Sequence, residues 1–272
     1  SEWPVIHGFG YGGGVGTEDW TVSQNRITNV TGEDITGIVL FNVNGVTLER
    51  NYVEHATSGV SGRRGHNLDG CSDLTMTDCY VDMGLRSPSN SNASFGAARY
   101  SLQLSMSDQS VSDVHVCNNT FQGGYDGVVT LGHGDISDVE LVNNTFTDNV
   151  LVARPHAGTN GPPASVNRFT TEHNDIPDQV YGVFVDDGGS SGDPYTDFAA
   201  NLNDRSGHSG AALLVQSGAN VTDVIDAERN WWGDRNGPDG DVSDPDGLTS
   251  VKPWLRNQQA AGTVPGDGCL DD

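Results

Sequence analysis

The feature that most constrains this chain is an eight-residue pattern that recurs along most of its length. Two copies stand out, VHVCNNTF at residues 114–121 and VELVNNTF at residues 139–146, with apolar side chains at the first, third and eighth places and Asn at the sixth. A period of 25 to 30 residues indicates a repeat architecture, in which each unit is stabilised by its neighbours. The other copies are WTVSQNRI from Trp20, VTLERNYV from Val46, LTMTDCYV from Leu74, FTTEHNDI from Phe169, a weaker FAANLNDR from Phe198 and IDAERNWW from Ile225.

The sixth place of the pattern predicts a ladder of stacked amides. Apolar places that alternate at period two indicate a strand with one buried face, and the Asn marks the turn after it. Asn tolerates a left-handed backbone, and its amide can bond to an identical amide in a copy stacked about 4.8 Å away. The sixth places are Asn25, Asn51, Cys79, Asn119, Asn144, Asn174, Asn203 and Asn230, which are 26, 28, 40, 25, 30, 29 and 27 residues apart.

A second apolar run lies between successive Asn turns and predicts a second strand in each repeat. Two strands per repeat, the same turn each time and no helical stretch describe an all-β fold, a single-stranded parallel β-helix of about eight coils. The runs are GIVLFN from Gly37, SLQLSMS from Ser101, GVVTLG from Gly127, VLVARP from Val150, YGVFVDD from Tyr181 and AALLVQS from Ala211.

The regular spacing predicts one solenoid domain over residues 20–256 of the 272. Residues 1–19, rich in Gly and aromatic side chains, are interpreted as a flexible leader, a cap over the first coil or an arm that adds to another subunit's sheet. Residues 87–100 are expected to form a loop that projects from the solenoid wall, and residues 257–272 a C-terminal tail.

The segment after Asn230 reads NWWGDRNGPDGDVSDPDG and leads to VKPWL. It resembles the closing segment of secreted and cell-surface right-handed parallel β-helix proteins, the pectate-lyase-like solenoids. The resemblance implies a right-handed solenoid whose last coil is covered by Trp rings. It leaves the function open, because such solenoids include lyases, hydrolases, epimerases, adhesins, viral spikes and structural subunits. The matching residues are Asn230, Trp231, Trp232, Gly233, Gly237, Pro238, Pro253, Trp254 and Leu255.

The charge balance argues against nucleic acid as a partner. The chain has 13 Lys and Arg residues against 37 Asp and Glu, a formal net charge of −24, and its only lysine is Lys252. Phosphate binding needs rows of cations, whereas this composition gives a solvated acidic surface. The composition is similar to that of haloarchaeal proteins; the alternative is an ordinary acidic secreted protein. No stretch is apolar enough for membrane insertion, and a start at Ser1 suggests a processed chain, so we expect an extracellular or cell-surface location.

The four cysteines have no metal-binding spacing and can pair in three ways. Cys79 replaces a ladder Asn, and we favour a small buried side chain there over a disulfide. The others are Cys71, Cys117 and Cys269.

Catalysis is considered at a column of residues that follow the second strand of each coil. Lyase chemistry on uronic acids needs a base and a cation, and hydrolysis needs paired carboxylates. The alternative is that these are solvated turn residues. The catalytic candidates are Arg154, His156, His133, Asp186 and Asp187, the binding candidates are Arg63, Arg64 and His66, and the column also includes Ser105, Ser107, Asp135 and Gln216.

Two comparisons with known β-helix enzymes limit this hypothesis. Gly132-His133-Gly134 and Asp186-Asp187 are similar to motifs of the polygalacturonase group, but their order along the chain is reversed, so the roles are not transferred. With a single lysine, the chain also lacks the lysine base that some β-helix lyases use.

An Asp-rich loop near the C-terminus is a candidate Ca²⁺ site, because hard cations take oxygen ligands. The alternative is an acidic loop that turns at its glycines. The candidate ligands are Asp234, Asn236, Asp239 and Asp241, followed by Asp244 and Asp246.

Five N-x-S/T sequons are consistent with export. Asn118 and Asn143 share one template place in adjacent coils, so glycans there would collide. The candidate glycosylation sites are therefore Asn92, Asn29 and Asn220.

Three functions are consistent with these observations. The first is an extracellular structural or adhesive protein that self-associates into a filament or spike. The second is a secreted lyase or glycoside hydrolase acting on acidic polysaccharide, and the third is a non-catalytic protein that binds polysaccharide or a cell-surface glycan. The missing catalytic set favours the first, a protein that is not an enzyme and has no cofactor beyond Ca²⁺.

Overall fold

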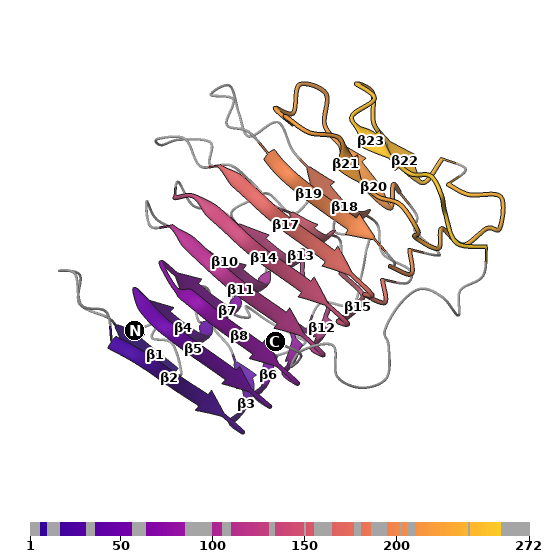
Figure 1. Cartoon of the computed structure of the whole chain (residues 1–272). Helices are drawn as coiled ribbons and strands as arrows, with labels where there is room; N and C mark the ends of the chain where they lie inside the picture. Colours follow the sequence, from indigo (N-terminus) through magenta and orange to yellow (C-terminus); the bar gives the residue numbers. More distant parts are fainter. Residues whose placement is uncertain are drawn as a thin grey trace.

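The computed structural model describes residues 6–9, 17–30, 36–55, 64–84, 100–104, 110–130, 134–149, 151–154, 165–176, 181–185, 195–201, 203–205, 210–238 and 240–256. Their regular structure is β-strand, and every strand pairing is parallel. These residues contain no helix that is long and apolar enough to cross a membrane. The strands stack coil upon coil from the N-terminal to the C-terminal end, as Figure 1 shows.

The second apolar run of each repeat forms the first of the three sheets, sheet A. Each predicted run lies on or overlaps one of its strands, which confirms the prediction. Sheet A consists, in order, of β1 (Ile6–Phe9), β4 (Thr36–Phe41), β7 (Arg64–Asp69), β10 (Tyr100–Leu104), β13 (Asp126–Thr130), β16 (Leu151–Arg154), β18 (Tyr181–Val185), β20 (Leu213–Val215) and β22 (Val242–Ser243).

The eight template copies form sheet B, one strand for each copy from β2 to β21, and β23 completes it. Adjacent copies pair in the predicted register, so that Val114 lies beside Val139 and Val139 beside Phe169. Sheet B consists, in order, of β2 (Thr17–Ser23), β5 (Val43–Glu49), β8 (Ser72–Thr77), β11 (Val111–Cys117), β14 (Ile136–Val142), β17 (Val166–Glu172), β19 (Tyr195–Asn201), β21 (Ile225–Asp226) and β23 (Thr249–Ser250).

A third sheet, sheet C, was not predicted. Its short strands begin directly after the ladder residue and include the eighth template place, which is why that place is apolar. Strands of three to five residues are too short to show a clear alternating pattern, so only the structure reveals them. Sheet C consists of β3 (Arg26–Val30), β6 (Tyr52–His55), β9 (Tyr80–Asp82), β12 (Thr120–Gln122) and β15 (Thr145–Thr147).

The core is the interior of the coil stack. Leu48, Met76 and Leu141, all at the third template place, are completely buried. At the eighth place the Phe121 and Phe146 rings stack with centroids 5.2 Å apart. Burying such a side chain stabilises the fold by about 1.5–3 kcal/mol. Each coil gains this stabilisation only because the next coil covers its apolar side chains.

The predicted amide ladder is present and buried. The backbone N–H and the side-chain amide of Asn119 both donate to Oδ1 of Asn144, at 3.0 and 3.1 Å. Asn144 makes the same pair of bonds to Asn174, at 2.9 and 3.1 Å. Asn174 bonds in this way to Asn203, and Asn203 to Asn230. Each coil is therefore held in register with the next by hydrogen bonds inside the solenoid.

The left-handed residue at this turn is the one before the ladder Asn, not the Asn itself as expected. Asn118 and Asn143 have φ values of 56° and 57°, whereas the ladder residues do not have positive φ. This backbone turns the next side chain inward, where its amide can stack. The other left-handed residues at this place are Gln24, Arg50, Asp78, His173 and Arg229.

Cys79 interrupts the ladder and is a free, buried thiol. Burial raises the pKa of the Cys79 thiol to about 11. Asn51 approaches its sulfur with the backbone nitrogen at 3.4 Å and the side-chain nitrogen at 3.8 Å. On the other side, Asn119 Oδ1 accepts the Cys79 backbone N–H at 2.9 Å. The cysteine thus fills the place but supplies no amide.

The C-terminal end is covered by Trp side chains, in agreement with the resemblance in this segment. Trp232 is 2% exposed and belongs to the core. Trp254 packs against the core, and its indole N–H donates to the carbonyl of Arg235 at 3.3 Å. Leu255 ties the closing segment to the ladder by donating its N–H to the carbonyl of Asn230 at 3.0 Å.

The described part of the N-terminal segment belongs to the solenoid. Strand β1 pairs with β4 of the same chain, with Ile6 beside Ile38 and Phe9 beside Phe41. The predicted boundary after residue 19 falls within β2. Tyr100, the last residue of the loop predicted over 87–100, instead begins β10. Residues 1–5 and 10–16, the rest of that loop and the tail at 257–272 lie outside the described residues.

We predict that Cys79→Asn stabilises the protein. An Asn at this place donates an amide to Asn119 and offers Asn51 an oxygen acceptor, for a gain of about 1 kcal/mol and a rise in melting temperature of about 2–4 °C. Thermal unfolding by circular dichroism measures the change. Cys79→Ala is the control and should lower the melting temperature; equal melting temperatures for Cys79→Asn and Cys79→Ala would contradict the prediction.

We predict that Gly237→Ala disturbs the packing of Trp254 at the C-terminal end and lowers the stability of the protein. Gly237 has a φ of 102°, and a Cβ there would lie 2.6 Å from the Trp254 ring. The left-handed backbone costs about 1–2 kcal/mol, and the overlap adds about 1–3 kcal/mol. Gly240→Ala is the matched control, because Gly240 also has positive φ but nothing within 4 Å of the new Cβ. Urea unfolding should show the larger loss in Gly237→Ala; equal losses would mean that the contact with Trp254 is unimportant.

Candidate functional site

The candidate site is built on a left-handed residue that recurs along sheet B. We call this place a bulge because two successive side chains face outward there, although neighbouring strands stay in register. In seven of the eight template copies the residue just before the copy has positive φ, for example Asp113 (55°), Asp138 (55°) and Asp197 (49°). Burial along β11 shows Val111 inside, then Ser112 and Asp113 facing out, then Val114 inside again. A bulge of this kind re-aims a side chain. It therefore adds one outward-facing side chain to a strand wherever this residue is not Gly.

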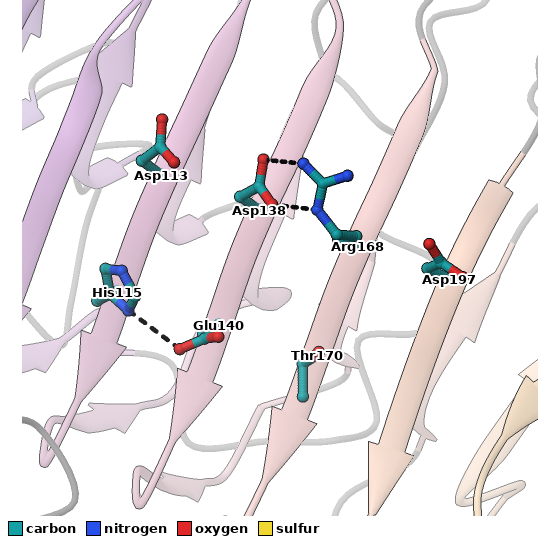
Figure 2. Close-up of a pocket in the computed structure, with 7 residues that line it drawn as sticks. All are labelled: Asp113, His115, Asp138, Glu140, Arg168, Thr170 and Asp197. Atoms are coloured by element: carbon teal, nitrogen blue, oxygen red, sulfur yellow. Dashed lines mark hydrogen bonds and ion pairs between the residues drawn. The ribbon is translucent and has the colours of Figure 1, made fainter. Parts of the chain in front are cut away.

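These side chains line a shallow pocket of 390 Å³ on the outer face of sheet B, which we call the charged face. Figure 2 shows two rows of side chains across the strands. The upper row is formed by the bulge residues and the lower row by the second template place, where His115, Glu140 and Thr170 are in register. The charged face consists of Asp113 and His115 on β11, Asp138 and Glu140 on β14, Arg168 and Thr170 on β17, and Asp197 on β19.

An ion pair links two strands in the upper row. Both Nε and one terminal nitrogen of Arg168 donate to the two carboxylate oxygens of Asp138. This bidentate hydrogen bonding to Arg168 lowers the pKa of the Asp138 carboxyl, and Asp138 raises the pKa of Arg168 in return. The side chains remain 30% and 54% exposed, so solvent screens the pair. The pair fixes the position of Arg168 more than it stabilises the fold.

The lower row contains a second pair. His115 Nδ1 and Glu140 Oε2 lie 3.0 Å apart, and both side chains are 51% exposed. A His–carboxylate contact is a common arrangement for proton transfer, but such sites also exclude water or carry a cover. At this exposure both groups are open to solvent, which suits hydrogen bonding to a ligand better than catalysis.

The charged face combines acceptors and donors at regular intervals. Carboxylates accept hydrogen bonds from hydroxyl groups, and the free nitrogen atoms of a guanidinium or imidazole donate to oxygen. Neighbouring strands lie about 4.8 Å apart, so the face presents the same kind of group again at each coil. This arrangement is suited to an extended ligand with repeated hydroxyl groups.

The register of sheet A contradicts the prediction that the candidate residues on it form one column. Arg64 lies beside Thr36 and Tyr100, whereas Arg154 lies beside Val129. Since Val129 pairs with Gln103 and Gln103 with Asn67, the two arginines fall three residues apart along the strands. The prediction of one shared column is wrong for them.

The reason is strand β7, which the sequence did not reveal. Its sequence RGHNLD has little apolar character, so the pattern predicts that Arg64 and His66 lie in the turn after a strand. In the structure both lie within the strand, with His66 beside Ile38 and Leu102.

Two of the other column members face solvent. Asp135 is exposed, and its carboxylate accepts the N–H and hydroxyl of Ser165, at 3.1 and 2.8 Å. Gln216 is exposed as well. The roles proposed for the column stay predictions, and the members outside the described residues are Arg63, Ser105, Ser107, His133, His156, Asp186 and Asp187.

The Asp-rich loop uses its carboxylates to bind its own backbone. Asp234 accepts the N–H of Asn236 at 2.7 Å, and Asp244 accepts the N–H of Thr249 at 2.7 Å. Across the described residues, no three His, Cys, Asp or Glu side chains form a group that could hold a metal ion. Asp239 lies outside them, while Asp241 is half-buried. Ca²⁺ binding by this loop stays a prediction.

The sequons separate into two groups. Asn29 and Asn220 are exposed, as an acceptor must be, while Asn92 lies outside the described residues. Asn143 donates its amide to the side-chain oxygen of Asn118 in the preceding coil, so these two do lie against each other. Glycosylation itself stays a prediction.

Three parallel sheets wound into one solenoid define the chain as a β-helix protein, and the charged face lies on one wall of it. The family model described as a right handed beta helix region matches residues 11–202. The chain belongs to the right-handed β-helix family. No match is found among curated proteins or among solved structures.

We predict that Arg168→Gln returns the pKa of Asp138 toward the ordinary Asp value, about 3.9. Because the folded-state pKa of Asp138 is lowered, the ion pair stabilises the protein above that ordinary value, and its contribution disappears as the pH falls through the lowered pKa. Carboxyl-carbon NMR titration of Asp138 measures the change directly. Arg26→Gln, which removes a guanidinium stacked on Tyr52 in sheet C, is the control for the loss of one charge. An unchanged Asp138 titration in Arg168→Gln would contradict the assignment.

Proposed function

We propose that this chain is an extracellular adhesive protein that binds a neutral, hydroxyl-rich polysaccharide on the charged face of sheet B without cleaving it. The observation that carries the proposal is the open pocket lined by polar side chains from four successive strands. The β-helix family is consistent with surface and polysaccharide-related proteins. The regular spacing of the coils matches the repeated units of a polymer.

The sign of the charges supports a neutral ligand over an acidic one. The charged face contains four carboxylates and one guanidinium, and that guanidinium is paired with Asp138. The whole chain carries a net charge of −24. An anionic polymer would be repelled by this surface, whereas sugar hydroxyls donate hydrogen bonds to carboxylates. The proposal therefore differs from the acidic polysaccharide considered from the sequence.

Cleavage of a polysaccharide at the same face is the second candidate. The contact between His115 and Glu140 favours it, since these groups could exchange a proton with a bound sugar. The exposure of both side chains argues against it, because catalytic groups are normally shielded from bulk water.

Association of the solenoid with further copies of itself is a separate proposal. The pairing of β1 with β4 supports a coil at the N-terminal end over an exchanged arm. Open sheet edges at an end of a solenoid favour stacking between copies. Light scattering across salt and Ca²⁺ concentrations tests self-association independently of glycan binding.

We predict that Glu140→Gln and Asp113→Asn each weaken binding to a neutral polysaccharide about tenfold, since each removes a charge-assisted hydrogen bond. Affinity electrophoresis against neutral and acidic polysaccharides measures binding, while reducing-sugar release and ultraviolet absorbance of unsaturated ends measure cleavage. Asp73→Asn is the matched control, because Asp73 occupies the same bulge place on β8 but lies outside the pocket.

Binding that Asp73→Asn and Asp113→Asn reduce equally would contradict the assignment of the charged face. Preference for acidic polymers would contradict the choice of ligand. Release of sugar ends that Glu140→Gln abolishes would establish the second candidate instead.

A further inference from the structure

Arg205 is a charged side chain inside the solenoid. It occupies the eighth template place, where other coils have Phe121, Phe146 and Ile176, and it is completely buried. Its backbone N–H donates to the carbonyl of Trp231 in the next coil at 2.8 Å, which holds it in the stack. The side chain therefore enters the core at the C-terminal end of the molecule.

The guanidinium of Arg205 is held by neutral acceptors. One terminal nitrogen, Nη1, donates to the carbonyl of Ala212 at 2.8 Å, and Nε lies 3.4 Å from Oδ1 of the ladder residue Asn230. The other terminal nitrogen, Nη2, is buried and has no acceptor. Burial lowers the pKa of Arg205 to about 9, which leaves it protonated at neutral pH. None of the described carboxylates forms an ion pair with it.

A second donor without an acceptor lies on the next coil. Trp232 is 2% exposed, and its indole Nε1 is buried with no partner. The guanidinium carbon of Arg205 lies 5.7 Å from the centroid of the Trp232 ring. Two unsatisfied donors, one of them positively charged, thus lie on adjacent coils of the core.

The chemistry of these two donors limits which groups could accept their hydrogen bonds. A buried charge is strongly unfavourable unless it is paired, and a buried N–H needs an acceptor. A water molecule can accept a hydrogen bond but supplies no charge. A halide ion accepts hydrogen bonds from several directions and balances the guanidinium. The described carboxylates do not do this: Asp204, next to Arg205 in the chain, is also buried, but burial alone accounts for the lowered pKa of Arg205.

We propose that Arg205 and Trp232 form a buried binding site for one small monovalent anion of the halide class, between the last coils of the solenoid. The anion accepts hydrogen bonds from Arg205 Nη2 and Trp232 Nε1 and neutralises the guanidinium. It is enclosed when the C-terminal end closes, so folding and anion binding are coupled. The site shares no residue with the charged face and does not depend on the proposed glycan binding.

The test compares chloride with gluconate, an anion too large for the core, at matched ionic strength. A site saturated about 100-fold above its dissociation constant should raise the melting temperature of the wild-type protein by about 5 °C in chloride. Arg205→Met keeps much of the side-chain volume without the charge and should abolish the difference between the two salts. Trp232→Phe keeps an aromatic ring without the N–H and should reduce the difference.

Comparing each variant with the wild type in the same two salts removes general effects of salt on stability. Crystals grown in bromide supply a direct observation, an anomalous peak within hydrogen-bonding distance of Arg205 Nη2 and Trp232 Nε1. If Arg205→Met does not fold, Trp232→Phe and the bromide crystals decide. The proposal is overturned if the chloride effect is the same in wild type and variants, or if bromide is absent from the site.

Discussion

The in-register stacking of parallel coils is the constraint on which the rest of this structure depends. A coil cannot bury its apolar side chains alone, and it gains that burial only when the next coil lies directly over it. The buried ladder through Asn144 and Asn174 makes this alignment specific, because a slip of one residue would leave amide groups in the core without partners. The ladder also tolerates a local defect, since Cys79 fills its place with a thiol while the sheets continue on both sides.

The same alignment produces the charged face. A bulge in one strand would place a single side chain on the surface, whereas a bulge repeated in register places a row of them. Asp113, Asp138 and Asp197 therefore lie on one wall although 84 positions separate the first from the last. A surface that presents the same kind of group on each coil is suited to a ligand with repeated units. The regular architecture of the solenoid therefore matches a repeating ligand.

Charged side chains have different environments inside and outside the solenoid. Outside, Arg168 meets Asp138 in water and the pair contributes little to stability. Inside, Arg205 replaces a large apolar residue and has only neutral acceptors. Because Arg205 is buried, its charge affects stability far more than the exposed ion pair does. Arg205 lies near the C-terminal end, where Trp side chains cover the last coil.

Much of the fold was accessible from the sequence alone. The template copies and the second apolar runs predicted sheets A and B, and the recurring Asn predicted the ladder, because alternation and stacking leave a periodic pattern in the residues themselves. The repeated Asp just before the template copies was also visible in the sequence. Its meaning was not, because only the structure shows that the backbone there is left-handed and the side chain faces out.

Four features were decided by the tertiary structure. Sheet C and strand β7 carry too little apolar periodicity to be recognised, and missing β7 shifted the predicted column of candidates on sheet A. The pocket exists because residues from four coils meet, and the state of Arg205 depends on which atoms surround it in the core. The sequence alone determined the winding of the chain, since each coil repeats a local pattern; where charges meet, and whether they are paired, depended on contacts between residues that are far apart in the chain.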